Sequence, residues 1–460
     1  MTYQTVNPFN GDVLESFPEL SDRELEVALA TAATCFDSWR FARFAERAKI
    51  VARAAAIMRT RVEELARPVT LEMGKLIDQA RGEVLLSADI LDYYATNAER
   101  FLAPEHLAPA SGQADVISTP IGVLFGVQPW NFPYYQLSRF AAPNLMAGNV
   151  VMVKHAGCVP QCALAFEKLW RDAGAPAGAY TNLFISYDQV NRVIDDPRIK
   201  GVALTGSVEA GKQVAARAGQ NLKKSTMELG GSDAFIVLED ADLEKTVKWA
   251  VWGKMNNTGQ CCVAAKRFIV VEPLAARFLE QFRTALGALK PGDPMDAATT
   301  LGPLSTEAAL VKLVDQVKRA IAAGATLVMG GDRIDRPGSF MQPTILANIT
   351  PDNPAFHEEF FGPVALFFRV RDEDAAVALA NDSEFGLGGC VFTGDEARGR
   401  RVANRIDTGM MFVNHPTWTT PDLPFGGIKS SGYGRELSSM GIQEFVNKKL
   451  VRVASIDAPA

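Results

Sequence analysis

The sequence predicts an α/β fold of two lobes, with a ligand site in the cleft between them. From Asn149 onward, strand patterns alternate with helical patterns, which indicates parallel βαβ units and a doubly wound sheet. A second series of helices and strands begins at Leu243. The 460 residues suffice for two or three domains of ordinary size. Ligands favour the cleft between two such lobes.

The composition excludes several classes of protein. Hydrophobic residues make up 48% and charged residues 22% of the chain, which is ordinary for a globular protein and argues against disorder, collagen or coiled coil. The 47 basic and 53 acidic residues give a net charge of −6. Because the chain also has no basic block, nothing in it indicates nucleic-acid binding.

Cysteine usage and the N-terminus predict a cytoplasmic protein. Six cysteines, two of them adjacent, are too few for a disulfide scaffold and fit a reducing compartment. Residues 1–10 have neither the basic nor the apolar region of a secretory signal. Residues 116–138 carry no acidic or basic residue before Arg139, but three prolines and several amides make a membrane helix implausible. A buried, irregular functional segment fits better, and we expect no contact with a membrane.

The N-terminal part of the chain is predicted to be mainly helical. Ser21 and Glu24 have the spacing of a capping box, and an amphipathic pattern follows. Pro68 is expected to stop the second helix. Residues 115–127 place β-forming residues around Pro120, which predicts a hairpin or a pair of edge strands. Helices are expected up to residue 39 and over residues 44–66 and 70–101.

Two sets of alternating elements support the α/β class. In the first set, strands are expected at residues 150–153, 181–185, 202–204 and 234–237, with helices at 162–170, 190–194 and 208–218. In the second set, helices are expected at residues 243–255, 275–289 and 308–323. Its strands are expected at 268–271, 326–329, 364–368, 390–392 and 411–413, and a terminal strand at 449–453.

A glycine-rich turn matches most of a phosphate-binding loop. Residues from Gly206 to Lys212 have the loop's first seven positions, follow a strand and open a helix, but Gln213 lacks the hydroxyl that would bind Mg²⁺. An NTPase is therefore disfavoured. The helix N-terminus could still bind an anion such as the pyrophosphate of a dinucleotide. An ordinary strand-to-helix turn with Thr205 or Ser207 as N-cap is the alternative.

A vicinal cysteine pair marks a candidate nucleophile. Cys261 and Cys262 follow Gly259 at a turn between a helix and a strand, where side chains at the tip are accessible. Two small buried hydrophobic residues would be the alternative reading of the pair. Two further segments favour chemistry, although each could be an inert strand end or turn: Glu228 lies before two glycines as a candidate base, and Asn131 lies between two prolines as a candidate oxyanion donor.

Six motifs, in order along the chain, resemble those of the aldehyde dehydrogenase superfamily. The resemblance covers essentially the whole chain, and six motifs in the family order are highly specific. The chain is most similar to short bacterial NAD(P)-dependent succinate-semialdehyde dehydrogenases, through residues 154–156, 228–233 and 381–387. The six motifs are Pro129-Trp-Asn-Phe-Pro, Thr205-Gly-Ser, Glu228-Leu-Gly-Gly, Gly259-Gln-Cys-Cys, Glu359-Phe-Phe-Gly-Pro-Val and Gly434-Arg-Glu-Leu.

The resemblance implies a covalent mechanism for aldehyde oxidation. Cys262 matches the nucleophile that forms a thiohemiacetal, and Asn131 matches the residue that stabilises its oxyanion together with the Cys262 N–H. Hydride transfer to the nicotinamide leaves a thioester, and Glu228 matches the general base that activates water to hydrolyse it. Glu436 matches a position that helps to relay the proton outward. The expected reaction is oxidation of succinate semialdehyde to succinate, with another small polar or aliphatic aldehyde, or a thiol hydrolase, as alternatives.

The resemblance also implies a cofactor site. NAD-preferring relatives usually have a glutamate at the position of Gly157, which binds the adenosine ribose. Gly157 removes a carboxylate that would repel a 2′-phosphate, and Lys154 supplies a positive charge. We therefore expect NADP to be preferred and NAD to be used. The predicted cofactor residues are Trp130, Lys154, Gly157, Gly206, Ser207, Leu229, Glu359 and Phe361.

Arg139 is the candidate substrate residue. It is the only charged residue between Val116 and Val153, so it is expected to be interior and to require an anionic partner. A substrate carboxylate is one candidate partner, and a protein carboxylate from another segment is the other. A helix beginning at Pro133 would place Tyr135 on the same face. The predicted substrate residues are Tyr135, Arg139, Cys261 and Thr419, and no metal is expected.

The resemblance implies two Rossmann-type α/β domains and a β oligomerisation arm. Residues 1–104 and 121–230 are expected to form the dinucleotide-binding domain, and residues 231–440 the catalytic domain. Residues 105–120 and 441–460 are expected to form the arm. A homodimer or homotetramer follows from this resemblance.

Overall fold

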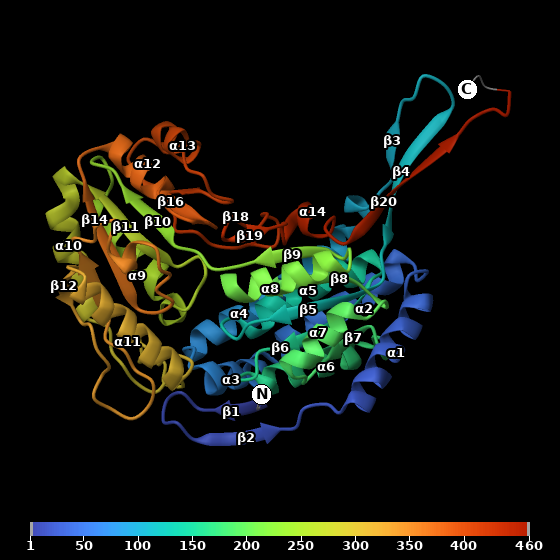
Figure 1. The fold of residues 1–460 in the computed structure, drawn as a ribbon, viewed down its shortest axis with the longest axis horizontal. Coiled ribbons are helices and arrows are strands. Elements are labelled where there is room, and N and C mark those ends of the chain that lie inside the picture. Colours follow the sequence, from blue (N-terminus) through green and yellow to red (C-terminus); the bar gives the residue numbers. More distant parts are fainter. Residues whose placement is uncertain (1–2, 458–460) are drawn as a thin grey trace.

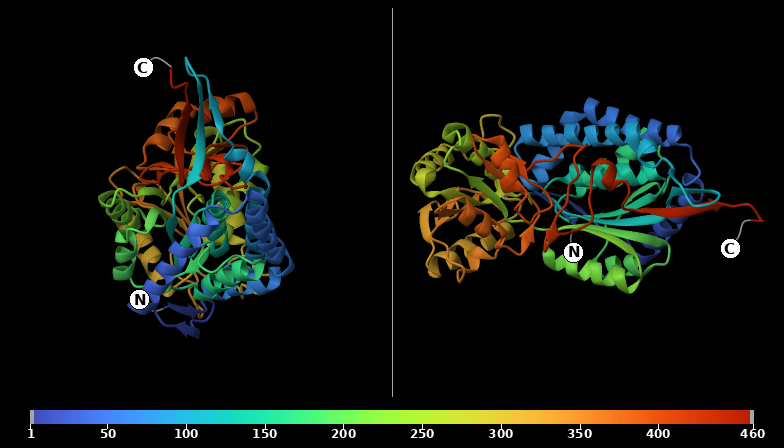
Figure 2. Two further views of the ribbon diagram at one scale, coloured as in Figure 1. Left: turned by 90° about the vertical axis from the view of Figure 1, so that its right-hand side faces the viewer. Right: turned by 90° about the horizontal axis from the view of Figure 1, so that it is seen from above.

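The computed structural model describes residues 3–457, which form two large β-sheets covered by helices and a separate β-arm (Figure 1). We call the half built on the six-stranded sheet the first lobe and the half built on the seven-stranded sheet the second lobe. The arm projects from the first lobe, away from the second (Figure 2). The predicted α/β class is confirmed, whereas the exact domain boundaries stay a prediction.

The first lobe is built on a sheet with strand order β19-β9-β8-β5-β6-β7. Five strands are parallel, and the short β19 pairs antiparallel with β9 at its edge. Strand β9 was not predicted because its sequence begins with polar residues. The strands are β5 (Val123–Gln128), β6 (Val150–His155), β7 (Tyr180–Asn182), β8 (Ile199–Thr205), β9 (Lys224–Glu228) and β19 (Gly432–Tyr433). The helices that follow them are α5 (Pro133–Ala147), α6 (Pro160–Ala173), α7 (Tyr187–Asp195) and α8 (Val208–Gln220).

Four N-terminal helices also belong to the first lobe. Ser21 and Glu24 form the predicted capping box. The prediction that Pro68 stops a helix is wrong, because the break falls at Arg61, with φ of −116°, and the next helix continues through Pro68 to Gly74. Val69, Thr70 and Met73, which follow the proline, are all fully buried. The free energy gained by burying them outweighs the loss of the backbone hydrogen bond that Pro68 cannot donate. The helices are α1 (Asp22–Trp39), α2 (Phe44–Thr60), α3 (Val62–Met73) and α4 (Ile77–Phe101).

A short hairpin precedes these helices at the N-terminal end of the described chain. It consists of β1 (Tyr3–Val6) and β2 (Val13–Phe17), which pair antiparallel. The backbone of Gln4 donates a hydrogen bond to Gly157 O at 3.0 Å, so the hairpin lies against the loop after β6. Within residues 3–457, no helix is long and apolar enough to cross a membrane.

The second lobe has the strand order β12-β13-β14-β11-β10-β16-β17, in which only β12 is antiparallel. Phe235 of the interior strand β10 stacks on Phe392 at 4.6 Å and forms part of the core. The strands are β10 (Asp233–Val237), β11 (Ala265–Val271), β12 (Thr326–Met329), β13 (Thr344–Ala347), β14 (Val364–Val370), β16 (Gly389–Phe392) and β17 (Phe412–Val413). The helices are α9 (Leu243–Met255), α10 (Glu272–Gly287), α11 (Glu307–Ala322), α12 (Glu373–Asn381) and α13 (Glu396–Ala403).

The arm is a three-stranded antiparallel sheet with the order β20-β4-β3. It consists of β3 (Glu105–Leu107), β4 (Gln113–Pro120) and β20 (Val446–Val453). The predicted hairpin over residues 115–127 is wrong, because β4 pairs with β20 while β5 enters the first lobe. The chain turns between them at Gly122, whose φ of 145° favours glycine. The backbone N–H groups of Ile121 and Gly122 are bound by Asn149 Oδ1.

The chain between β17 and β20 connects both lobes and the arm (Figure 1). Strand β18 (Ile428–Lys429) pairs with β15 (Phe385–Gly386), and β19 then joins the first lobe's sheet. Helix α14 (Ser438–Gly441) follows before β20 enters the arm. This segment brings Glu436 to the first lobe, so side chains from distant parts of the sequence meet there.

Candidate active site

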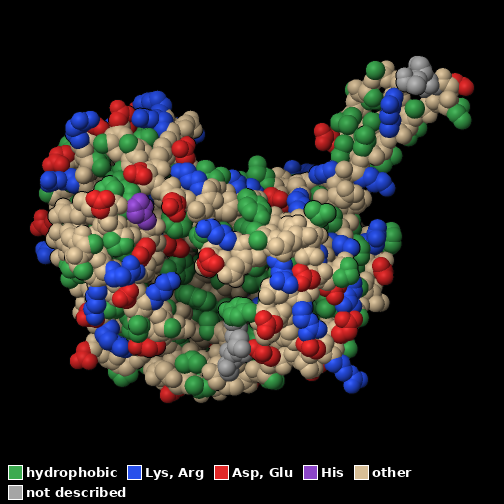
Figure 3. Space-filling model, in the orientation of Figure 1, with side chains coloured by type: hydrophobic (Ala, Val, Ile, Leu, Met, Phe, Trp, Pro, Cys, Tyr) green, Lys and Arg blue, Asp and Glu red, His purple; other side chains and the backbone are tan. Residues whose placement is uncertain are grey.

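A cavity of about 640 Å³ lies between the two lobes. Its volume is within the range of cofactor and ligand sites. In the orientation of Figure 1, the surface is hollowed between the half that contains α8 and the half that contains α11 (Figure 3). The cavity is lined by the loop after β5, the β8–α8 turn, the end of β9, Cys262, α11 and residues 358–361. Three of the predicted catalytic residues, Asn131, Glu228 and Cys262, therefore share one cavity.

Cys262 follows a tight turn at the end of α9. Asn257 and Thr258 have left-handed φ values of 53° and 54°, and Gly259 has φ of 75°. A Cβ at Gly259 would lie 2.2 Å from the backbone oxygen of Gly362, so this position excludes a side chain. Close packing against residue 362 thus fixes the direction in which the chain leaves the turn, and Cys262 reaches the cavity wall.

Lys266 holds the backbone of the cysteine pair. Its Nζ donates to Cys261 O at 2.9 Å and to Cys262 O at 2.7 Å, and it lies 3.1 Å from Glu359 Oε1. Because Lys266 is fully buried, these contacts are protected from water. The lysine therefore positions the nucleophile and places a positive charge beside it. Sequence reasoning missed Lys266, because its partners are known only once the turn is folded.

The two thiols are electrostatically linked. The Cys262 thiol donates a hydrogen bond to Cys261; this bond, together with burial, raises the pKa of Cys262 and lowers the pKa of Cys261. The positive charges of Arg139 and Lys266 act in the opposite direction. A nearby group that accepts a proton is therefore needed to make Cys262 the nucleophile.

Asn131 is held against the cysteine turn. Its Nδ2 donates to Gln260 O at 3.1 Å, and its backbone oxygen accepts from Asn257 Nδ2 at 2.8 Å. The side-chain amide has two N–H groups, so a second donor stays available to an oxyanion in the cavity. This arrangement allows Asn131 to act as a fixed hydrogen-bond donor.

A buried ion pair supports Asn131 from behind. Lys75 pairs with Glu83, and Lys75 Nζ donates to Asn131 O at 2.8 Å. Glu83 Oε1 accepts from the backbone N–H groups of Tyr134 and Tyr135 at 2.8 and 3.2 Å, at the N-terminus of α5. The pair thus fixes both the loop that carries Asn131 and the helix after it. No local sequence signal identified this pair, since its partners lie on separate elements.

Glu228 ends β9 and is buried. Neither of its carboxylate oxygens has a hydrogen-bond partner among residues 3–457. Burial raises its pKa well above the usual range, Glu436 adds to this effect, and Arg139 opposes it. A carboxyl group with a raised pKa is a stronger base once ionised, and its free oxygens can accept a proton from water or from a thiol.

The β8–α8 turn supplies a helix N-terminus to the same cavity. Ser207 is the N-cap, and its side chain accepts from Ala210 N at 3.3 Å. Gln213 bonds to Glu209 within the helix, as expected for a residue without a metal-binding role. Six predicted cofactor residues line the cavity: Trp130, Gly206, Ser207, Leu229, Glu359 and Phe361. The positive end of the α8 dipole lies at Ser207 and would attract the phosphates of a dinucleotide.

Lys154, in β6, and Gly157, in the loop after it, do not line this cavity. Lys154 Nζ lies 3.3 Å from His155 O and close to the rings of Tyr3 and Tyr187. Burial lowers the pKa of Lys154 to about 8. An anion bound here would therefore meet a lysine whose charge depends on pH near neutrality.

Arg139 has a protein carboxylate as its partner, which is the second of the two partners that the sequence left open. It is buried and pairs with Glu436. Its Nη2 donates to Thr205 Oγ1 at 3.1 Å, and its Nη1 donates to the Tyr135 hydroxyl at 3.2 Å. The Tyr135 hydroxyl also lies 2.9 Å from Thr419 Oγ1. Three of the four predicted substrate residues are therefore joined in one hydrogen-bonded chain, although none of the four lines the large cavity.

A thiol nucleophile, an amide donor and a buried carboxylate at a dinucleotide-sized cavity are typical of a cysteine-dependent dehydrogenase with a nicotinamide cofactor. The family comparison agrees with this class: the model of the aldehyde dehydrogenase family matches residues 1–451. The chain belongs to the aldehyde dehydrogenase family.

Several relatives have closely similar sequences and structures. The succinate-semialdehyde dehydrogenase [NADP(+)] of Deinococcus radiodurans is 53% identical over 450 residues, which are 98% of this chain and 94% of the relative. A probable succinate-semialdehyde dehydrogenase [NADP(+)] of Synechocystis is 45% identical and covers 99% of this chain and 100% of the relative. The succinic semialdehyde dehydrogenase of Streptococcus pyogenes, solved with NADP+, is 46% identical with a TM-score of 0.97, over 98% of this chain and all of that one.

Replacing Lys75 tests how far Asn131 depends on the buried ion pair. Lys75→Met leaves the Glu83 charge buried without its partner, so we expect a loss of about 3–5 kcal/mol in the free energy of unfolding. A displaced Asn131 also lowers kcat by up to about a hundredfold. Denaturant unfolding and steady-state kinetics measure the two effects. Lys248→Met, which removes an exposed pair with Glu244, is the matched control and changes stability by less than about 1 kcal/mol. Equal effects of the two substitutions would contradict this role.

Proposed function

We propose that this protein oxidises succinate semialdehyde to succinate, with NADP+ as the preferred cofactor and NAD+ as a second one. The observation that carries the chemistry is the meeting of Cys262, Asn131 and Glu228 on one cavity. The substrate and cofactor assignments are supported by the relatives from Deinococcus radiodurans, Synechocystis and Streptococcus pyogenes. No histidine lines the described cavity, which disfavours a thiol hydrolase.

Each residue of the cavity has one role in the proposed reaction. Cys262 loses its proton and attacks the aldehyde carbon, which gives a thiohemiacetal on the protein. Asn131 Nδ2 and the Cys262 N–H stabilise the oxyanion. A nicotinamide held in the cavity lined by Trp130, Leu229 and Phe361 would supply the hydride acceptor that converts the thiohemiacetal to a thioester. Glu228 then takes a proton from water, whose hydroxide attacks the thioester on Cys262.

The Tyr135 hydroxyl is the best candidate for binding the distal carboxylate. Because Arg139 donates to the Tyr135 oxygen, the Tyr135 O–H is left to donate elsewhere. Thr419 supplies a second hydroxyl 2.9 Å away. Arg139 therefore acts through Tyr135 in the proposed site, while its own charge is balanced by Glu436.

The cofactor preference rests on residues 154 and 157. Gly157 presents no carboxylate to a 2′-phosphate, and Lys154 provides a cation nearby. Lys154 is confined by the rings of Tyr3 and Tyr187, which limits where its ammonium group can point. Such a confined cation suits a single phosphate.

The arm supports assembly into a homodimer or homotetramer. Leu450 and Val453 on β20 are 60% and 62% exposed, and β20 is an edge strand whose outer backbone groups have no strand partner in the described chain. An exposed apolar edge favours association with a second copy. All six cysteines are free thiols, which supports the proposed cytoplasmic location.

Substituting the nucleophile and the base tests the reaction itself. Cys262→Ala should abolish oxidation and leave cofactor binding intact, because only the covalent step is lost. Glu228→Gln should slow thioester hydrolysis more than hydride transfer, so a burst of reduced cofactor precedes a slow steady state. Stopped-flow absorbance at about 340 nm follows both phases, because the reduced nicotinamide absorbs there. In the parent protein, hydrolysis should rise with pH as the raised pKa of Glu228 is passed. Near-normal turnover of the Cys262→Ala variant would contradict the assignment of Cys262 as the nucleophile.

The charge of Lys154 makes NADP+ binding depend on pH. Below a pKa of about 8 the lysine is protonated and attracts the 2′-phosphate, so the Kd for NADP+ should rise as the pH increases through this value. The Kd for NAD+, which lacks that phosphate, should change little. Titration calorimetry with both cofactors measures the difference. Gly157→Glu should move the preference toward NAD+, and a parent protein that strongly favours NAD+ would overturn the assignment.

Removing the Tyr135 hydroxyl tests recognition of the carboxylate. Tyr135→Phe should raise KM for succinate semialdehyde about tenfold, which corresponds to about 1.4 kcal/mol for one hydrogen bond to a charged group. An uncharged aldehyde of equal length should be hardly affected. By contrast, Arg139→Ala should impair both aldehydes, since it also leaves Glu436 without its partner. Equal losses for both aldehydes in Tyr135→Phe would withdraw the substrate assignment.

Charged substitutions on the outer strand of the arm test assembly. A chain that ends before β20 would also lose the β4 pairing, so point substitutions are preferable. Leu450→Glu combined with Val453→Glu should shift the molecular mass in solution toward the monomer, because like charges would meet at the apolar edge. Light scattering measures the mass. Lys449→Glu, on the same strand but without an apolar side chain, is the control, and an unchanged mass in the double variant would exclude β20 as the interface.

A further inference from the structure

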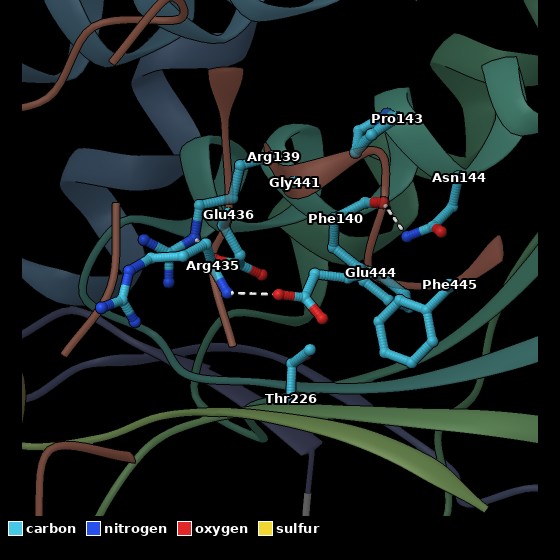
Figure 4. A pocket seen from close by; sticks show the side chains of 10 residues that line it. All are labelled: Arg139, Phe140, Pro143, Asn144, Thr226, Arg435, Glu436, Gly441, Glu444 and Phe445. Carbon is cyan, nitrogen blue, oxygen red and sulfur yellow. Dashed lines mark hydrogen bonds and ion pairs between the residues drawn. The ribbon is translucent and has the colours of Figure 1, made fainter. Parts of the chain in front are cut away.

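A second, small cavity lies in the first lobe, between α5, β9 and the segment from Arg435 to Phe445 that contains α14 (Figure 4). Its water-accessible volume is about 10 Å³, which is close to the space of one water molecule. Its charged lining side chains come from α5 and from the segment between β19 and β20. Its polar lining includes Arg139, Thr226, Arg435, Glu436 and Glu444.

Three carboxyl groups follow one another through this region. Glu228 and Gly434 both pack against Gly426. A Cβ added to Gly426 would lie within 2.8 Å of Glu228 Oε1 and of the backbone oxygen of Gly434, so these two atoms are close to one another. Glu444 Oε1 accepts a hydrogen bond from Arg435 N at 2.8 Å, directly after Gly434. Glu436 is the next residue, and its carboxylate and that of Glu444 point toward one another in Figure 4. The three groups are therefore arranged around the segment from Gly434 to Glu436.

The burial of these carboxyl groups decreases outward. Glu228 and Glu436 are both buried, whereas the side chain of Glu444 is 23% exposed. On its solvent side, Glu444 lies 3.9 Å from Lys224 Nζ. The last carboxyl group of the series can therefore exchange a proton with solvent outside the large cavity.

The proposed reaction requires such an exchange. When Glu228 takes a proton from the attacking water, an O–H bond of water breaks and one forms on Glu228. The hydroxide adds to the thioester, the C–S bond breaks, and Cys262 leaves as a thiolate. Glu228 then still holds the proton and must lose it before the next turnover. Glu228 opens only onto the large cavity, which a bound dinucleotide and the acyl group would fill, so a route through the protein lets the proton leave while they are bound.

We propose that Glu444 is the outer end of a proton-release path in which the proton passes from Glu228 to Glu436, through the small cavity to Glu444, and then to solvent. Glu444 touches neither substrate nor cofactor, so it acts through Glu228 and Glu436. This inference rests on the proposed role of Glu228 as the base.

Several charged groups surround the path and stabilise its ionised members. Arg139 from α5 pairs with Glu436, and Lys224 from β9 faces Glu444. Arg435 contributes a backbone donor to Glu444 and a positive charge that acts on Glu228. Tyr94 from α4 approaches Glu436, but its hydroxyl is bound to Ser438 O at 2.9 Å. Arg139 keeps Glu436 available as a proton acceptor, whereas the long, exposed pair of Lys224 with Glu444 contributes little.

Glu444→Gln is the decisive variant. A glutamine keeps an oxygen that accepts the Arg435 N–H but cannot carry a proton, so the fold is retained. We expect the burst of reduced cofactor and KM to stay unchanged and the steady-state kcat to fall about three- to tenfold at low pH and low buffer concentration. A small diffusible base such as imidazole should restore kcat as its concentration rises. Release of protons, followed with a pH indicator, should lag further behind the burst than in the parent protein.

Two further variants separate a proton-transfer role from a structural one. Glu444→Asp, which keeps a titratable group, should recover much of kcat, and Lys224→Gln, which removes only the solvent-side ion pair, should leave kcat near that of the parent. The path is refuted if Glu444→Gln has the parent's kcat at low buffer, or if its loss is not relieved by imidazole and is shared by the aspartate variant. If Glu228→Gln does not slow thioester hydrolysis, the assignment of Glu228 as the base is wrong. If Glu228→Gln slows hydrolysis but Glu444→Gln has the parent's kcat, the base assignment stands and only the proton path is refuted.

Discussion

The ion pair between Lys75 and Glu83 is the interaction on which the arrangement of the site depends. Both charges are out of water, where an ion pair is stabilising only if its other polar atoms are also satisfied. Here Lys75 also binds the oxygen of Asn131, and Glu83 binds the first N–H groups of α5. One pair thus fixes the loop of the amide donor and the start of the helix that carries Arg139. The cysteine turn is then tied to the same loop through Gln260 O.

The chemistry of the site depends on how charges are balanced in a small buried volume. Lys266 and Arg139 favour negative charge at the thiols, whereas the burial of Glu228 disfavours it at the carboxyl group. Glu436 balances Arg139 and thereby prevents a cation from holding Glu228 permanently ionised and inert. A base that must take up and release a proton in each turnover benefits from this near balance.

Local sequence patterns predicted what local forces determine. The capping box of Ser21 and Glu24 needs only residues of one helix turn, and the α/β alternation follows from apolar spacing. The motifs around Asn131, Glu228 and Cys262 located the three residues that share the cavity. Errors occurred where distant contacts decide. Packing beyond Pro68 kept α3 helical, and pairing with β20 drew residues 113–120 away from the expected hairpin.

Arg139 illustrates the same limit within the site. Its isolation among uncharged residues correctly indicated burial, but the sequence left open which carboxylate it would meet. The partner, Glu436, lies almost three hundred residues later in the chain, so only the folded structure identifies it. Lys75 and Lys266 were missed for the same reason. A charged residue in an apolar stretch predicts that an oppositely charged partner is needed. Which residue is that partner depends on how the chain folds.

The segment between β17 and β20 has a consequence for cooperativity. Within residues 412–453 the chain contributes a strand to the second lobe, one to the pairing with β15, one to the first lobe and one to the arm. Because one continuous segment carries all four strands, unfolding of one strand removes a restraint on the others. The two lobes are therefore expected to unfold as one cooperative unit. A single proteolytic cut between β17 and β19 would therefore separate three parts from the second lobe together: β20 of the arm, Glu436, and strand β19, which pairs with β9 at Glu228.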